Sequence, residues 1–177
     1  GINGHTYELI NEPGITWDAA RIAASQKILE GTQCHGYLAT VTSQNENDFL
    51  VAAFGNSLTY KWIGGFQAEG YSNTVNDGWE WVTGEPWVYT NWNIGEPNNE
   101  YYGTELGYED ALAYWNSAGA WNDVASAYPY DGYIVEYDCI AVPNLPPVAN
   151  AGPDQNAIRC EVANTSITAT GFRFSLA

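Results

Sequence analysis

The sequence predicts an α+β domain, and three features of its pattern point to this class. Apolar residues recur at helical spacing in two segments of the first half. Short runs rich in Val, Ile, Tyr and Trp follow, separated by Gly, Pro and Asn, as is typical of short strands and turns. Residues 83–109 form a long polar and aromatic segment, and a loop of this length in a compact domain is usually functional. We therefore expect two helices, short antiparallel strands and one large loop.

The first half is expected to alternate strands with the two helices. Residues 5–10 read as the first strand, and Thr16 can cap a helix over residues 17–29. An extended run follows at residues 37–41. The second helix has the clearest boundaries, with Ser43 at its start and Gly55 at its end.

Ser43 and Glu46 fit a capping box, in which the hydroxyl accepts from the third amide and the glutamate reaches back to the cap. This helix is predicted to turn four apolar side chains inward: Phe49, Leu50, Ala53 and Phe54.

The second half contains no helical periodicity. Four further short strands are predicted, at residues 61–65, 79–82, 111–115 and 132–137. The α+β domain is expected to end near Asp138.

Composition changes after Ile140, which divides the chain into a domain at residues 1–140 and a second part at 141–177. Prolines make residues 143–147 a stiff linker. Residues 148–155, which read Val-Ala-Asn-Ala-Gly-Pro-Asp-Gln, resemble the opening of a PKD-type immunoglobulin-like repeat. Residues 148–177 fall short of the ~100 residues of such a sandwich. We expect an incomplete β module here, with a disordered tail as the alternative.

Charge and hydropathy exclude several classes of partner. Acidic residues outnumber basic ones 21 to 5, giving a net charge of −16. This composition argues against nucleic acid and against anionic membrane surfaces, which attract Lys and Arg. No apolar run approaches the ~20 residues of a membrane span, so membrane insertion is not expected. The excess of carboxylates suits cation binding, with a merely acidic surface as the alternative.

Two segments of the second half offer ligands for a cation. Glu96–Asn98 reads Glu-Pro-Asn, Trp121–Asp123 reads Trp-Asn-Asp, and Glu109 lies between them. Carboxylate and amide oxygens are the hard donors that Ca²⁺ prefers. The order and spacing of these residue types therefore indicate a calcium site.

Residues 5–138 resemble a C-type lectin domain. The matching segments come in order along the chain: Ile15–Ala20, Tyr37–Val41, Glu46–Phe49, Trp62–Gly65, Gly95–Asn98, Trp121–Asp123 and Gly132–Glu136. The resemblance implies a C-type lectin fold with a long calcium-binding loop.

The resemblance also implies a combined calcium and sugar site with a cis peptide bond before Pro97. Two vicinal sugar hydroxyls would coordinate the metal and bond the same side chains, because a carboxylate accepts while an amide both ligates and donates. In the family, Glu-Pro-Asn accompanies mannose, glucose, N-acetylglucosamine and fucose, whereas Gln-Pro-Asp accompanies galactose. The five implied residues for both metal and sugar are Glu96, Asn98, Glu109, Asn122 and Asp123.

The chain departs from the family pattern at several points. Its loop between Asn98 and Glu109 is longer than in typical mannose binders, so Glu100 or Glu105 are alternatives to Glu109. Gln67 stands where an auxiliary calcium site would place an acid. The remaining candidates for auxiliary metal ligands are Asp77, Asn99 and Asp110.

The four usual disulfide cysteines of the family are absent, and the chain has three cysteines in all. Cys34 and Cys139 are either a substitute bridge or buried free thiols. Trp87 and Trp92 are candidates for stacking on a sugar, with core packing as the favoured role.

The resulting hypothesis is a calcium-dependent carbohydrate-binding module of a larger secreted or cell-surface protein. The alternative is a protein-interaction or adhesion module on the same fold, with calcium in a structural role and Tyr101, Tyr102 and Tyr108 contacting the partner. No enzyme is expected, because no carboxylate pair stands out and His5 and His35 lie in no triad-like context.

Overall fold

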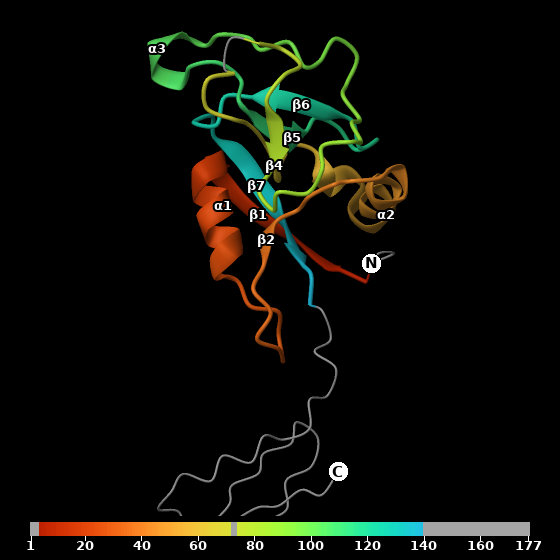
Figure 1. Ribbon diagram of the computed structural model, residues 1–177. Helices are drawn as coiled ribbons and strands as arrows, with labels where there is room; N and C mark the ends of the chain where they lie inside the picture. The colour runs from red at the N-terminus through yellow and green to blue at the C-terminus, as the bar shows by residue number, and fades with distance from the viewer. Residues whose placement is uncertain (1–3, 72–73, 140–177) are drawn as a thin grey trace, which may run out of the picture. The chain divides into compact units, whose positions relative to one another are not determined.

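The computed structural model describes residues 4–71 and 74–139 (Figure 1). The predicted linker and PKD-type module, at residues 141–177, lie outside these residues. In the described part the elements follow one another as β1 (Thr6–Ile15), α1 (Trp17–Gln26), β2 (Tyr37–Leu38), α2 (Gln44–Phe54), a 3₁₀ turn (Gly55–Leu58), β3 (Lys61–Gln67), β4 (Trp79–Trp81), α3 (Gly103–Leu106), β5 (Ala111–Tyr114), β6 (Trp121–Val124) and β7 (Tyr130–Tyr137). The predicted α+β class is confirmed.

One seven-stranded sheet organises the domain. Its main path runs β1-β7-β3-β5-β6, with β2 paired to β7 and β4 paired to β3. All pairs are antiparallel except β3 with β7, which are parallel. Figure 1 shows α1 and α2 flanking the strands, while the long loop extends over β5 and β6 at one end of the domain. The sheet thus carries the loop at the edge where β6 lies.

The two helices begin where the sequence predicts. Thr16 Oγ1 accepts from the Ala19 amide at 3.4 Å, and Ser43 Oγ accepts from the Glu46 amide at 3.3 Å. The Glu46 carboxylate reaches back one residue further than a capping box requires, to the Thr42 amide at 2.8 Å. Both helices therefore start at hydroxyl caps.

The predicted ends and inward faces of the helices are only partly right. α2 ends before Gly55 as expected, but Ala53 is exposed, whereas Leu50 is buried. α1 ends at Gln26, three residues early, because the chain turns there and the Leu29 amide donates to the Cys34 carbonyl at 2.9 Å.

Strand β2 is shorter than predicted because the backbone beyond Leu38 bonds elsewhere. The Ala39 carbonyl accepts from the Gly64 amide at 2.8 Å, and the Thr40 amide donates to the Glu136 side chain at 2.8 Å. These bonds still tie residues 39–40 to β3 and β7.

Two apolar clusters form the core. One contains residues of α1 and of β3 and β7, including Trp17, Trp62 and Val135. The other lies toward α2 and the long loop, and includes Leu50, Trp81 and Trp121. Trp121 is fully buried, so β6 is anchored firmly beneath the loop.

Cys34 and Cys139 form a disulfide, with their Cα atoms 5.5 Å apart. Of the two alternatives that the sequence allowed, the disulfide is therefore confirmed and the pair of free thiols is wrong. It joins the turn after α1 to the end of β7, 105 positions further along the chain. Within the described residues, no helix has both the length and the apolar character to cross a bilayer.

Candidate metal and ligand site

The β5–β6 hairpin brings the two halves of the candidate site together. β6 carries Asn122 and Asp123, and its register places Asp123 opposite Leu112 of β5. Glu109 precedes β5 and is 2% exposed, while Asp123 is fully buried. Adjacent strands thus hold two acids under the long loop.

The long loop folds back so that its Glu-Pro-Asn segment lies on Asp123. The Asn98 amide donates to Oδ1 of Asp123 at 3.1 Å, and the Asn99 amide donates to Oδ2 at 2.8 Å. The peptide bond between Glu96 and Pro97 is cis. Segments 24 and 25 positions apart in the sequence therefore meet at one carboxylate.

Three carboxylates converge at this point. Glu96, Glu109 and Asp123 each direct one oxygen into a group whose atoms all lie within 4.8 Å of one another. In the described part of the chain, no hydrogen-bond partner is found for the buried Oε2 of Glu96. Glu109 and Asp123 are buried and Glu96 is half-buried. A cation would stabilise such a group of acids, which contains no basic side chain.

The electrostatics of the cluster reflect this crowding. Burial, together with the charges of Asp123 and Glu96, raises the pKa of Glu109 to about 8, although the hydrogen bond from the Glu100 amide acts in the opposite direction. Burial and the charge of Asp123 raise the pKa of Glu96 to about 7. The pKa of Asp123 is also raised, chiefly by burial. The protons that these acids retain are the ones that a bound cation would displace.

The two predicted amide ligands lie beside the carboxylates. Asn98 Oδ1 accepts from the Glu100 amide at 2.9 Å, and Asn122 Nδ2 donates to the Asp123 carbonyl at 2.7 Å. Asn122 is 8% exposed, whereas Asn98 is exposed. The structure therefore gathers the other four predicted residues around Asp123.

Of the three acids considered for the fifth position, Glu109 is the one in the carboxylate group. Glu105 is exposed on α3. Glu100 is also exposed, and its backbone amide donates to Oε2 of Glu109 at 2.9 Å. The long insertion between Asn98 and Glu109 thus holds the Glu109 carboxylate through the backbone amide of Glu100.

The candidates for an auxiliary metal site are held by protein hydrogen bonds. The Gln67 side-chain amide donates to the carbonyls of Thr74 and Asp77, each at 2.8 Å. Asn99 Nδ2 also donates to the Thr74 carbonyl, at 3.0 Å. Asp110 accepts from the Ser126 amide at 2.8 Å and from its hydroxyl at 3.3 Å. The side-chain amides of Gln67 and Asn99 therefore hold the carbonyls of residues 74–77 by hydrogen bonds.

Thr74 is a residue that sequence reasoning missed. It contributes a backbone carbonyl, which any residue type supplies, so no sequence signal marks it. Its role is seen only in the structure, where its carbonyl accepts from the side-chain amides of Gln67 and Asn99.

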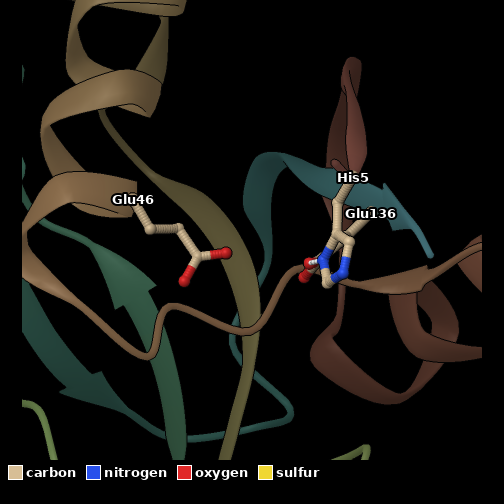
Figure 2. Close-up of side chains that lie close together, drawn as sticks. All are labelled: His5, Glu46 and Glu136. Carbon is tan, nitrogen blue, oxygen red and sulfur yellow. Dashed lines mark hydrogen bonds and ion pairs between the residues drawn. The ribbon is translucent and has the colours of Figure 1, made fainter. Parts of the chain in front are cut away.

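A second carboxylate cluster joins β1, α2 and β7 (Figure 2). His5 Nδ1 contacts Oε1 of Glu136 at 2.5 Å, and Glu46 extends from α2 toward this pair. The Tyr7 hydroxyl donates to both Glu46 and Glu136. Backbone donors at Thr42 and Thr40 serve the remaining oxygens, so the cluster clamps the three elements together. This contact accords with a structural role for His5.

Trp87 and Trp92 are half-buried and pack against the core. Trp87 lies 4.5 Å from Trp81 between ring centroids, and Trp92 lies 5.0 Å from Trp79. Both rings adjoin Trp121. Their packing fixes the path of the long loop toward the carboxylates.

The family of the chain follows from comparison with known sequences. Residues 31–131 match the Lectin C-type domain family. The chain belongs to the C-type lectin domain family. Halomucin of Haloquadratum walsbyi is 32% identical over 148 residues, and a perlucin-like protein of Mytilus galloprovincialis is 32% identical over 105 residues. The matches cover 76% and 56% of this chain, but 1% and 60% of those proteins, so the chain spans less than two thirds of either.

Solved structures confirm the C-type lectin fold. The lectin CEL-I from Cucumaria echinata gives a TM-score of 0.59 at 22% identity, covering 76% of this chain and 90% of that one. The cow carbohydrate-recognition domain of CD23, solved in the presence of a GlcNAc2Man3 oligosaccharide, gives 0.56 at 24% identity, covering 75% and 87%. At these identities the likeness concerns the fold alone.

Proposed function

We propose that this domain is a calcium-dependent carbohydrate-binding module of a larger secreted or cell-surface protein. The observation that carries the proposal is the convergence of Glu96, Glu109 and Asp123, with one oxygen of each inside a 4.8 Å group. Hard carboxylate oxygens at this density suit Ca²⁺. The buried Oε2 of Glu96, for which the described residues offer no partner, supplies a ligand position.

The residues around the metal would bind sugar hydroxyls directly. Two vicinal hydroxyl oxygens of the sugar would coordinate the bound calcium. The same hydroxyl groups would donate hydrogen bonds to the carboxylates. Asn98 and Asn122 would ligate through oxygen and donate through nitrogen. The order of Glu96 before Asn98 favours mannose, glucose, N-acetylglucosamine or fucose over galactose, as the family pattern implies. The oligosaccharide named with the cow CD23 domain supports glycan as the ligand class.

A protein-interaction or adhesion module is the second candidate. It is favoured by three tyrosines around α3, Tyr101, Tyr102 and Tyr108, which are 40–50% exposed. Aromatic residues of this kind are enriched at protein interfaces. In this alternative, calcium would only fix the loop that presents them. Neither candidate includes catalysis.

A glycan array separates the two candidates. In millimolar calcium, the folded protein is expected to bind mannose- or glucose-type glycans, and EDTA should abolish every signal. The double variant Glu96→Gln with Asn98→Asp exchanges the positions of the acid and the amide. It should move binding toward galactose or abolish it, whereas a protein interface at the exposed tyrosines would be unaffected.

The double variant Glu12→Gln with Asn11→Asp on β1 makes the same chemical exchange at exposed positions away from the carboxylates, and it should retain the wild-type pattern. Glycan signals that persist in EDTA, or that ignore the exchange at Glu96 and Asn98, would refute the proposed site.

A further inference from the structure

An aromatic cleft of about 500 Å³ adjoins the carboxylate site. Its volume lies in the range of ligand pockets. Its walls are rings from four parts of the chain: Tyr60, Tyr102, Trp115, Tyr128 and Tyr130. The first four are 38–44% exposed, so their faces are available to a ligand. No local sequence pattern indicates this cleft, because its rings come from separate segments.

Contacts among the rings hold the walls in place. Tyr60 lies 5.7 Å from Trp115 and 5.4 Å from Tyr130, measured between ring centroids. Tyr128 lies edge-on to Tyr130 at 5.7 Å. Tyr130 is itself stacked on the buried Trp62 at 4.6 Å. The aromatic surface is therefore supported by the core and is largely preformed.

The long insertion supplies the remaining wall. The Tyr102 amide donates to the Gly107 carbonyl at 2.8 Å, which closes the turn that contains α3. The Tyr102 hydroxyl donates to Glu100 at 3.2 Å, and its ring lies 6.4 Å from Tyr128. The extra residues between Asn98 and Glu109 thus place a tyrosine over the cleft.

The cleft and the proposed sugar site share two side chains. Glu109 and Asn122 line the cleft, and both belong to the group gathered around Asp123. They are 2% and 8% exposed, so each presents its polar atoms from a fixed position. A ligand held at the carboxylates would therefore extend directly into the cleft.

The chemistry of the lining selects the occupant. Aromatic faces pack against the apolar C–H faces of pyranose rings, while tyrosine hydroxyls exchange hydrogen bonds with sugar hydroxyls. Asp131 and Glu109 add carboxylates to the lining, and the chain carries a net charge of −16. Sulfated, sialylated or uronic sugars would be repelled.

We infer that this cleft is a second sugar subsite, which binds the neutral pyranose adjacent to the one coordinated at the carboxylates. The inference rests on the proposed function and makes the ligand a neutral oligosaccharide instead of a single terminal sugar.

Calorimetry with matched sugars tests the subsite. Methyl α-mannoside, methyl β-glucoside and the neutral disaccharides built from mannose and glucose would be titrated into the full chain in millimolar calcium. At least one disaccharide should bind about tenfold more tightly than its monosaccharide. Tyr102→Ala and Tyr128→Ala should each remove most of that gain while leaving monosaccharide affinity within about twofold.

Tyr71→Ala serves as the control, because Tyr71 is a similarly exposed tyrosine whose ring packs on Gly78 and lies outside the cleft. It should keep both affinities. Tryptophan fluorescence gives a second readout on the protein with both tyrosines intact. The disaccharide should change the tryptophan emission more than the monosaccharide does, and Trp115→Phe should remove this difference.

The outcomes separate the two proposals. If monosaccharides bind in calcium but no disaccharide binds more tightly, the subsite is refuted and the proposed function stands. Equal losses of mono- and disaccharide affinity in the tyrosine variants would also refute the subsite. If no sugar binds in calcium, the proposed function fails, and the subsite fails with it.

Discussion

At the scale of single residues, Asp123 is the centre of the candidate site. Its two oxygens accept the amides of Asn98 and Asn99, so one buried side chain fixes the returning loop. The same carboxylate lies in the group with Glu96 and Glu109. Repulsion within this group is large when the acids are ionised and free of metal. Loop structure and cation binding are therefore coupled through Asp123.

This coupling predicts an unusual pH dependence of stability in EDTA. The folded-state pKa of Glu109, about 8, lies above its ordinary value of 4.5. The folded protein therefore holds a proton that the unfolded chain releases. The stabilisation is fully present below the ordinary value and is lost as the pH rises through about 8. Urea midpoints in EDTA should fall between pH 6 and pH 9.

Calcium should remove this decline, because the metal replaces the protons. Burial also raises the pKa values of Asp110 and Glu136, which act in the same direction. Glu109→Gln isolates the site, since this variant should show a smaller decline in EDTA. Midpoints in EDTA that stay level or rise with pH would contradict the assignment.

At the scale of elements, the pairing of β1 with β7 depends on a glycine. Gly132 lies opposite Asn11 and has φ +139°. A Cβ atom at this position would lie 1.9 Å from the Ile10 carbonyl oxygen. The two strands can therefore approach each other here only because residue 132 has no side chain.

Gly132→Ala is expected to destabilise the domain by about 3 kcal/mol or more, because backbone strain is added to a steric clash. Gly84→Ala is the matched control. Gly84 also has a positive φ, +76°, but its Cβ would meet nothing within 4 Å. It should cost about 1–2 kcal/mol. Chemical unfolding measures both, and equal losses would show that the close approach at Gly132 is unimportant.

Local signals explain which elements the sequence predicted. Ser43 and Gly55 marked the ends of α2 correctly, because a hydroxyl cap and a glycine act within one turn. β6 and the four-residue α3 were missed, since their pairing depends on distant partners. The parallel contact of β3 with β7, through Trp62 and Tyr133, left no local pattern either.

The candidate site shows the same division between local and distant information. Residue types around Glu96 and Asp123 indicated oxygen ligands, but only the resemblance to a family placed the two segments together. The structure brings them into contact at 3.1 Å. The cleft beside them was not predicted. Tyr102 and Tyr128 lie close together only because of the path that residues 99–108 take in three dimensions.

At the scale of the whole domain, the contacts that join distant elements use residues other than those of the candidate site. The Cys34–Cys139 disulfide closes a separation of 105 positions, and such long closures typically contribute about 4 kcal/mol. The cluster of His5, Glu46 and Glu136 ties α2 to β1 and β7. The loop that carries Glu96 can therefore respond to calcium while these contacts hold the rest of the domain together.

Calorimetric titration of methyl α-mannoside into the folded protein, first in millimolar calcium and then in EDTA, tests directly whether calcium is needed for sugar binding. We expect saturable binding of the mannoside in calcium, no binding in EDTA, and no binding in calcium to the Asp123→Asn variant. Mannoside binding of equal strength in EDTA, or undiminished binding by Asp123→Asn, would show that calcium at these carboxylates does not hold the sugar.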